Sequence, residues 1–238
     1  MFPGVSDGID GLRRQRVNGC VKIAPGSRLL FIGDSVTDCG RLRPVGRGSL
    51  HALGTGYAAE VAALMEPFYE KRPIQIVNMG TEGDTVTDLA RRWDADVFAF
   101  EPHWLSVMIG INDVWHQVGR AAVAASVTLD VFWDTYSQVL SRTRPALKGL
   151  VLMTPYYVQS DRADPMRMMM EEYSRVVKDL ANRHDALLVD TQAAMDKVLA
   201  RLDYKAIAPD RVHPTKLGHQ VLAHAFTRAV GITPRRRR

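Results

Sequence analysis

Two short segments of the chain carry residues that together could transfer an acyl group. Ser35 lies in FIGDSVTDCGR, directly after an apolar run, and Asp210 and His213 lie three residues apart in DRVHP. Acyl transfer needs a nucleophile, a base that takes its proton and an acid that orients the base. Ser35 is therefore the candidate nucleophile, His213 the candidate base and Asp210 the candidate orienting acid.

Two further segments, NMG (78–80) and GIND (110–113), carry donors for the oxyanion that forms during acyl transfer. We expect the backbone N–H groups of Ser35 and Gly80 and the side-chain amide of Asn112 to form the oxyanion hole. Glycine at position 80 lets the backbone approach the substrate closely. Loss of one such donor typically costs about 3–4 kcal/mol of transition-state stabilisation.

Each of these residues also has an ordinary structural interpretation. A serine after a strand suits a turn or a helix cap, and a single histidine can cap a helix. We expect Asp34 to hold the turn before Ser35 through hydrogen bonds to nearby backbone. The segment GDSVT does not complete G-x-S-x-G, because Thr37 occupies the position of the second glycine, so a strained nucleophile elbow is disfavoured. The catalytic interpretation therefore depends on all four segments meeting at one place.

Neither a metal nor another cofactor is expected. His213, His219 and His224 are separated by six and five residues, and these spacings do not put all three imidazoles on one helical face. No cysteine lies near them in the sequence to complete a zinc site. A metal-free mechanism is therefore the prediction.

Three aromatic residues near the ends of apolar runs are candidates for substrate contact. Trp115, Tyr156 and Tyr157 could stack on a sugar or an acyl group, but aromatic residues at such positions equally often pack locally. A substrate-binding role for Trp115 and Tyr156 is therefore kept as a hypothesis beside the packing alternative.

The candidate residues need a sheet that brings them together. Five apolar runs with little alternation predict strands that are covered on both faces: 28–33, 74–80, 104–110, 149–155 and 186–190. Helical patterns lie between them, such as the apolar stripe from Met166 to Leu180. This alternation predicts an α/β fold with a five-stranded parallel sheet between two helical layers. Ligands of such sheets bind at the carboxyl ends of the strands, where the loops after residues 33, 80 and 110 lie.

Length, charge and cysteine content limit the classes of protein. The 238 residues fit a single domain (1–238) with an irregular N-terminal arm (1–21) and a basic tail (235–238). The net charge is +5, but without the four terminal arginines 27 basic residues face 26 acidic ones, so no nucleic-acid partner is expected. No apolar run approaches the roughly 20 residues of a bilayer span, and no secretory signal is visible. With only two cysteines, we expect a cytoplasmic protein without a membrane partner.

The four segments match, in order and spacing, the four blocks of the SGNH (GDSL-type) hydrolases, which this chain resembles. Longer stretches resemble the acetyl-xylan and xylo-oligosaccharide acetylesterase branch of that family. They are LLFIGDSVTDCGR, LGTGYAAEV, DLARRWDADV, MIGINDVW, LMTPYYV, VDTQAA and DRVHPTKLGHQVLAHAF. The resemblance covers roughly residues 22–231. One departure is His103 in EPHW, where relatives commonly have aspartate; it precedes a strand, and little effect on the chemistry is expected.

This resemblance implies a flavodoxin-like three-layer α/β/α fold that hydrolyses acetyl esters on sugars without a metal. It carries Ser35, Gly80, Asn112 and His213 into the roles already named, with Asp210 completing the triad. It also makes a homo-oligomer plausible by analogy with relatives.

The sequence therefore predicts a serine esterase that removes short acyl groups, acetyl above all, from xylan-derived or other acetylated oligosaccharides. The expected partner is a small-molecule or oligosaccharide ester. Two alternatives stay open. The first is a lysophospholipase or arylesterase of the same family, and the second is a catalytically inactive carbohydrate-binding relative.

Overall fold

The computed structural model describes residues 21–118 and 127–232. The predicted arm, except for Val21, and the predicted basic tail lie outside these residues. Within the described part of the chain, no helix is long and apolar enough to cross a bilayer.

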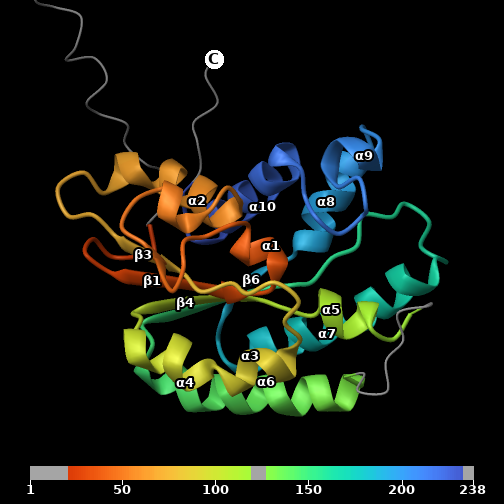
Figure 1. The fold of residues 1–238 in the computed structure, drawn as a ribbon, viewed down its shortest axis with the longest axis horizontal. Coiled ribbons are helices and arrows are strands. Elements are labelled where there is room, and N and C mark those ends of the chain that lie inside the picture. The colour runs from red at the N-terminus through yellow and green to blue at the C-terminus, as the bar shows by residue number, and fades with distance from the viewer. Residues whose placement is uncertain (1–20, 119–126, 233–238) are drawn as a thin grey trace, which may run out of the picture.

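The described residues form a six-stranded sheet with helices on both faces (Figure 1). The strands are β1 (Arg28–Gly33), β2 (Gly46–Arg47), β3 (Gln75–Asn78), β4 (Trp104–Met108), β5 (Gly149–Met153) and β6 (Leu187–Val189). The α-helices are α1 (Ser35–Asp38), α2 (Tyr57–Met65), α3 (Val86–Arg91), α4 (Trp93–Asp96), α5 (Ile111–Trp115), α6 (Leu129–Thr143), α7 (Pro165–Arg183), α8 (Thr191–Leu199), α9 (Tyr204–Ile207) and α10 (Lys216–Ala229). Short 3₁₀ turns span His51–Leu53, Glu66–Phe68, Phe98–Phe100 and Arg144–Ala146.

The strand order is β2-β3-β1-β4-β5-β6, and all strands except β2 run parallel. The predicted three-layer parallel fold is confirmed, but the predicted strand number of five is wrong. The sixth strand, β2, pairs antiparallel to β3 through only two residues, Gly46 and Arg47. A two-residue edge strand contains no apolar run, so no hydrophobic pattern could have indicated it.

Helices cover both faces of the sheet, and neighbouring side chains on a strand point to opposite faces, so each strand contributes to two buried clusters. Leu29 and Phe31 of β1 pack into the cluster under α2, α8 and α10, whereas Leu30 and Ile32 pack into the cluster under α3, α4, α6 and α7. The predicted stripe on α7 lies in this second cluster, which includes Met166, Met170, Tyr173 and Leu180. These methionines therefore fill the core.

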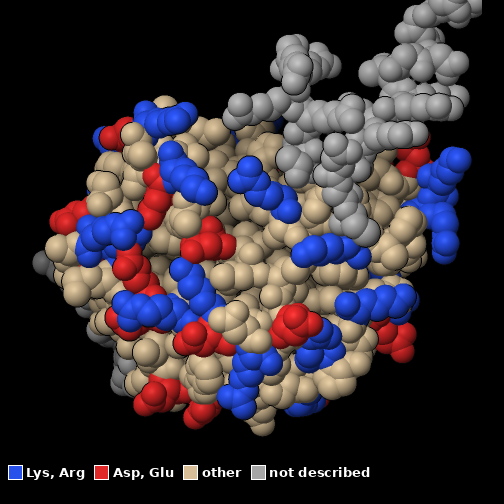
Figure 2. Space-filling view, turned by 180° about the vertical axis from the view of Figure 1, so that it is seen from behind, with Lys and Arg blue, Asp and Glu red and all other residues tan. Residues whose placement is uncertain are grey.

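Most charged side chains of the described residues lie at the surface or in ion pairs, whereas Asp34, Arg41 and Asp113 are buried and are held by hydrogen bonds to backbone groups. Figure 2 shows lysines and arginines interspersed with aspartates and glutamates over the side opposite to that of Figure 1. Exposed pairs such as Arg142–Asp94 and Arg175–Glu172 belong to this pattern of mixed charge. Each such pair contributes at most about 1 kcal/mol, so the buried clusters provide most of the stabilisation.

Three neighbouring strands direct their carboxyl ends to one edge of the sheet. Gly33 at the end of β1 is paired with Met108 at the end of β4, and Phe31 with Asn78 at the end of β3. Each strand is followed at once by a loop or a helix, so these segments meet at this edge, which the sheet topology makes the expected ligand site. His103 lies at the opposite end of β4, where its Nδ1 accepts the backbone N–H of Arg28.

A buried carboxyl connects two of the helices that begin at this edge. Asp113 of α5 has no exposed surface, and its Oδ1 accepts the N–H of Val86, the first residue of α3, at 3.0 Å. Helix α3 begins with the expected capping pair. The Thr85 hydroxyl accepts the backbone N–H of Asp88, and the Asp88 carboxylate accepts the backbone N–H of Thr85. The start of α3 is thus held from both sides.

The stability of the protein should depend on the pH through Asp113. Burial raises the pKa of Asp113 to about 7, whereas an unfolded chain ionises this group near pH 4. The stabilisation from this protonated group is complete below about pH 4 and is lost as the pH rises through 7. Urea titrations at pH 5 and pH 8 measure the free energy of unfolding. Between these pH values, that of wild type will fall by about 2–3 kcal/mol more than that of Asp113→Asn, at about 1.36 kcal/mol per pKa unit. A difference that is the same at both pH values would contradict this.

Candidate active site

The hydroxyl, imidazole and carboxylate named from the sequence form a continuous hydrogen-bonded chain. Ser35 Oγ lies 3.1 Å from His213 Nε2, and His213 Nδ1 lies 2.6 Å from Asp210 Oδ2. Ser35 and His213 are 178 residues apart in the sequence. The His213 and Asp210 side chains are 57% and 54% exposed, so the group is open to a substrate from solution.

Asp210 divides its two oxygens between the backbone and the imidazole. Oδ1 accepts the N–H groups of Val212 at 3.0 Å and His213 at 2.7 Å, which leaves Oδ2 for the ring. Partial burial alone would raise the pKa of Asp210, but the hydrogen bonds from His213 and from the two N–H groups outweigh it and lower this pKa. An ionised carboxylate only accepts, so Nδ1 of His213 carries the proton and Nε2 can accept from the serine.

The α9–α10 loop (208–215) holds this geometry through Arg211. This residue has a positive φ of 70°, and its carbonyl accepts the N–H of Val158 beyond the end of β5. Its guanidinium lies 3.9 Å from the centre of the Tyr204 ring and donates to the Val158 carbonyl. These contacts offset the strain of a left-handed backbone at a residue with a side chain.

Of the two aromatic residues proposed to bind substrate, only Trp115 is accessible. It is 42% exposed and lies three residues after Asn112 on α5, so the two side chains share a helix face. Tyr156 is 3% exposed, packs in the core and donates its hydroxyl to the Val212 carbonyl. The suggestion that Tyr156 stacks on substrate is therefore corrected: the tyrosine anchors the backbone next to His213.

Two of the three predicted oxyanion donors are available at the site. Asp34 caps α1 by accepting the Val36 N–H at 3.0 Å, as expected for the turn, and the N–H of Ser35 has no acceptor among the described residues. Asn112 donates one amide hydrogen to the Asp84 carbonyl at 2.8 Å. The other hydrogen of the Asn112 amide remains for an oxyanion.

The third predicted donor, Gly80, is already engaged. Its N–H donates to Asn78 Oδ1 at 2.9 Å. A Cβ at this position would lie 2.2 Å from the backbone nitrogen of Asp38 in α1. Glycine is thus required for close packing on α1, and the prediction of Gly80 as an oxyanion donor is corrected. The signal was present in the sequence, because an asparagine two residues before a glycine commonly accepts that N–H in a turn.

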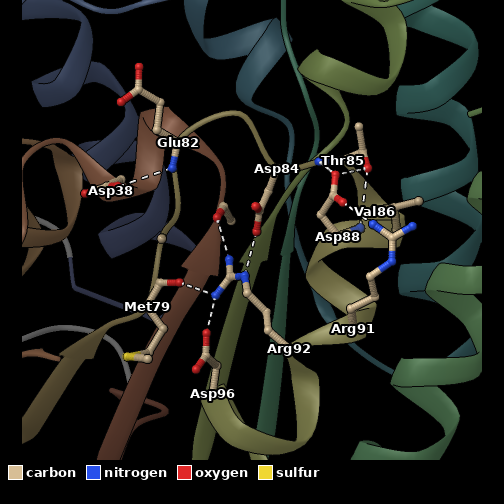
Figure 3. Close-up of polar contacts among 12 residues, drawn as sticks. Asp38, Met79, Glu82, Asp84, Thr85, Val86, Asp88, Arg91, Arg92 and Asp96 are labelled. Atoms are coloured by element: carbon tan, nitrogen blue, oxygen red, sulfur yellow. Dashed lines mark hydrogen bonds and ion pairs between the residues drawn. The ribbon is translucent and has the colours of Figure 1, made fainter. Parts of the chain in front are cut away.

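The residue that the sequence analysis missed is Gly83, in the loop between β3 and α3 (the β3–α3 loop, 79–85). It has a φ of 82°, a Cβ there would contact nothing, and its N–H has no acceptor among the described residues. On one side, the Glu82 N–H donates to Asp38 Oδ2 of α1; on the other, the Asp84 carbonyl accepts from Asn112 of α5. Figure 3 shows the α1 side of this arrangement. Gly83 therefore lies between the elements that carry Ser35 and Asn112.

The described residues contain no group of three or more histidine, cysteine or acidic side chains arranged to hold a metal. His219 is buried, its Nδ1 accepts the Tyr57 N–H at 3.1 Å, and its Nε2 lies 3.3 Å from Cys39 Sγ. Burial lowers the pKa of His219 to about 4. This imidazole is thus a neutral, hydrogen-bonded core group.

Comparison with known proteins shows the family of this chain. A model of the GDSL-like lipase/acylhydrolase family matches residues 31–221. The chain belongs to this family. It is 50% identical over 212 residues to an acetylxylan esterase of Geobacillus stearothermophilus, covering 89% of this chain and 97% of the relative.

Solved structures of an acetyl xylan esterase also match this chain. A tryptophan-to-isoleucine variant of Axe2, an acetyl xylan esterase from Geobacillus stearothermophilus, superposes with a TM-score of 0.88 at 49% identity, covering 91% of this chain and all of the other. A structure described as a catalytic mutant of Axe2, with serine replaced by alanine, superposes with a TM-score of 0.87 at 49% identity, covering 89% of this chain and 97% of the other.

Alanine substitutions at the two glycines will separate their roles. Gly80→Ala forces a Cβ into the α1 backbone and will lower the free energy of unfolding by about 3 kcal/mol or more. Gly83→Ala meets open space and costs only the left-handed backbone, about 1–2 kcal/mol. Urea unfolding of both variants measures the difference. Equal destabilisation, or the reverse order, would contradict the assignment of Gly80 to packing.

Proposed function

We propose that the chain is a serine esterase that removes acetyl and other short acyl groups from xylan-derived or related acetylated oligosaccharides. Family membership supports hydrolysis of carboxylic esters, and the identity to an acetylxylan esterase supports the carbohydrate substrate. The observation that carries the proposal is the 3.1 Å contact from Ser35 Oγ to an imidazole held by Asp210. Matched structures of Axe2 described as catalytic mutants replace a serine, a histidine or an aspartate, which also supports these three roles.

In the proposed reaction, Ser35 Oγ attacks the ester carbonyl carbon while His213 Nε2 takes the hydroxyl proton. Asp210 stabilises the imidazolium that forms. The tetrahedral intermediate collapses, the sugar hydroxyl leaves with the proton from His213, and the acyl group stays on Ser35. A water molecule then attacks the acyl carbon while His213 Nε2 takes its proton; the bond to Ser35 Oγ breaks, the carboxylic acid leaves, and His213 returns the proton to Ser35.

In this proposal, three hydrogen-bond donors stabilise the negative charge on the oxygen of the tetrahedral intermediate. They are the N–H groups of Ser35 and Gly83 and the free amide hydrogen of Asn112. Because these donors are held before the substrate arrives, they require no reorganisation as the charge develops.

The identity to an acetylxylan esterase supports a short acyl group. A cavity of about 10 Å³, with room for about one water molecule, lies among buried residues that include Val36, Ile111 and Tyr156, and neither Ser35 nor His213 lines it. A much larger hollow of about 1220 Å³ lies beside the amino ends of β1 and β3, lined by Arg28 and Gln75 among others. This position is at the far end of the strands from Ser35, so we assign the large hollow no part in the reaction.

Trp115 is the proposed platform for the sugar. Its exposed ring lies on the helix that carries Asn112, and a flat aromatic surface beside the acyl site suits stacking on a pyranose ring.

We also propose a single-domain organisation, a cytoplasmic location and a homo-oligomeric assembly. Both buried clusters pack on one continuous sheet, which supports the single domain. The proposed location rests on the low cysteine content, two in 238 residues. The assembly rests on analogy with relatives.

Substitution of the nucleophile tests the catalytic proposal. Ser35→Ala will lower kcat for p-nitrophenyl acetate by about 10⁴–10⁶-fold, because no other group replaces the attacking oxygen. Thermal unfolding should stay near that of wild type. If wild type binds acetylated xylo-oligosaccharides without hydrolysing them, the carbohydrate-binding alternative is correct instead.

Acyl-chain length separates an acetylesterase from a lysophospholipase. Because the relative at 50% identity is an acetylxylan esterase, we expect kcat/KM for p-nitrophenyl octanoate to be at least about 100-fold below that for the acetate, a difference of about 2.7 kcal/mol. The same enzyme will release acetate from acetylated xylo-oligosaccharides. Faster turnover of octanoyl esters or of lysophospholipids would support the lysophospholipase alternative.

A further inference from the structure

The guanidinium group of Arg92 donates hydrogen bonds to segments that form the proposed oxyanion hole. Arg92 stands at the junction of α3 and α4, and its side chain points toward the carboxyl end of β1 (Figure 3). Nε donates to Asp84 Oδ2 at 2.6 Å, and Nη2 donates to the Gly33 carbonyl at 3.0 Å. Nη1 donates to the Met79 carbonyl at 2.7 Å and to Asp96 Oδ2 at 2.5 Å. The side chain is only 18% exposed.

Three of these four acceptors belong to the two segments that carry backbone oxyanion donors, and the fourth, Asp96, lies on α4. Gly33 ends β1, two residues before Ser35, whereas Met79 and Asp84 lie at the two ends of the loop that contains Gly83. Arg92 is thus bonded both to the nucleophile strand and to the glycine loop. In contrast, the ion pair that Arg91 makes with Asp88 lies within the exposed surface of α3.

We propose that Arg92 is a positioning residue, which sets the distance between the Ser35 and Gly83 N–H groups and thereby shapes the oxyanion hole. This inference rests on the proposed esterase function.

Lysine cannot reproduce this arrangement. Four of the five guanidinium hydrogens are used, on acceptors that lie in different directions around a planar fork. An ammonium group has three hydrogens at one point and cannot reach all four acceptors. The substitution Arg92→Lys keeps the positive charge beside Asp84 and Asp96 but removes some of the hydrogen bonds that join β1 to the β3–α3 loop.

The remaining anchors of the β3–α3 loop do not depend on Arg92. Arg41 and Arg43 donate to the Gly80 carbonyl, and Asp38 accepts the Glu82 N–H. Loss of Arg92 therefore loosens the Asp84 side of the loop without unfolding it. Because an oxyanion donor acts only within about 2.7–3.1 Å, a shift of about 1 Å is expected to cost on the order of 100-fold in rate.

The test compares Arg92→Lys and Arg92→Gln with Arg91→Gln, a matched control at the adjacent arginine whose side chain is 75% exposed. For each variant, kcat and KM are measured with p-nitrophenyl acetate, and active sites are titrated with an organophosphate so that rates refer to folded enzyme. The inhibition constant of an alkylboronic acid, which forms a tetrahedral adduct on a serine, reports the oxyanion hole directly.

We expect both Arg92 variants to lose about 10–100-fold in kcat with KM changed less than about three-fold. The boronic acid will bind more weakly by a similar factor, and Arg91→Gln will match wild type within about two-fold. Wild-type kcat in Arg92→Lys, or an unchanged boronic acid affinity in a variant with reduced kcat, would overturn the inference.

A second variant covers the case in which neither Arg92 variant folds. Asp84→Asn keeps an acceptor for Arg92 but removes the charge that strengthens this bond. It is expected to lower kcat and boronic acid affinity together by about 3–10-fold, and unchanged values of both would overturn the inference. An inactive wild-type enzyme would instead contradict the proposed function, so the two failures are distinguishable.

Discussion

The pairing of β1 between β3 and β4 is the constraint on which the site depends. Parallel strands in register end at the same edge, so the turn that begins at Ser35, the β3–α3 loop and α5 are brought together by backbone hydrogen bonds alone. His213 reaches this edge from a different part of the chain, through a loop anchored to Val158 just beyond β5. The sheet therefore positions the serine and the donors, and a long-range loop delivers the base.

At the carboxyl edge of the sheet, the backbone N–H groups that have no acceptor within the described part of the chain are the ones that can bind a substrate oxygen. Most N–H groups near the strand ends are satisfied: Val36 by Asp34, Gly80 by Asn78 and Val86 by Asp113. Ser35 and Gly83 are different, because neither N–H has an acceptor among the described residues. Gly83 is exposed and Ser35 is half-buried, so water can satisfy these two N–H groups until a substrate oxygen replaces it.

Much of the fold and of the catalytic group could be predicted because the signals are local. Apolar runs without alternation indicated the covered strands, and the Asp-x-x-His spacing placed the Asp210 carboxylate within reach of the His213 ring. The wrong predictions concern features that local patterns do not specify. The edge strand β2 has two residues and no apolar run, and the core position of Tyr156 depends on the α9–α10 loop folding back over β5.

The three-layer architecture and the candidate nucleophile, base and acid could be named from the sequence, because hydrophobic periodicity and residue type act over a few neighbouring positions. The choice between Gly80 and Gly83 as the candidate donor is only partly local. The Asn78–Gly80 hydrogen bond joins residues two apart, whereas the close approach of Gly80 to the α1 backbone and the open space at Gly83 depend on how separate elements pack. The placement of Arg92 between Gly33 and Asp84 likewise arises only when strand, loop and helix are packed together.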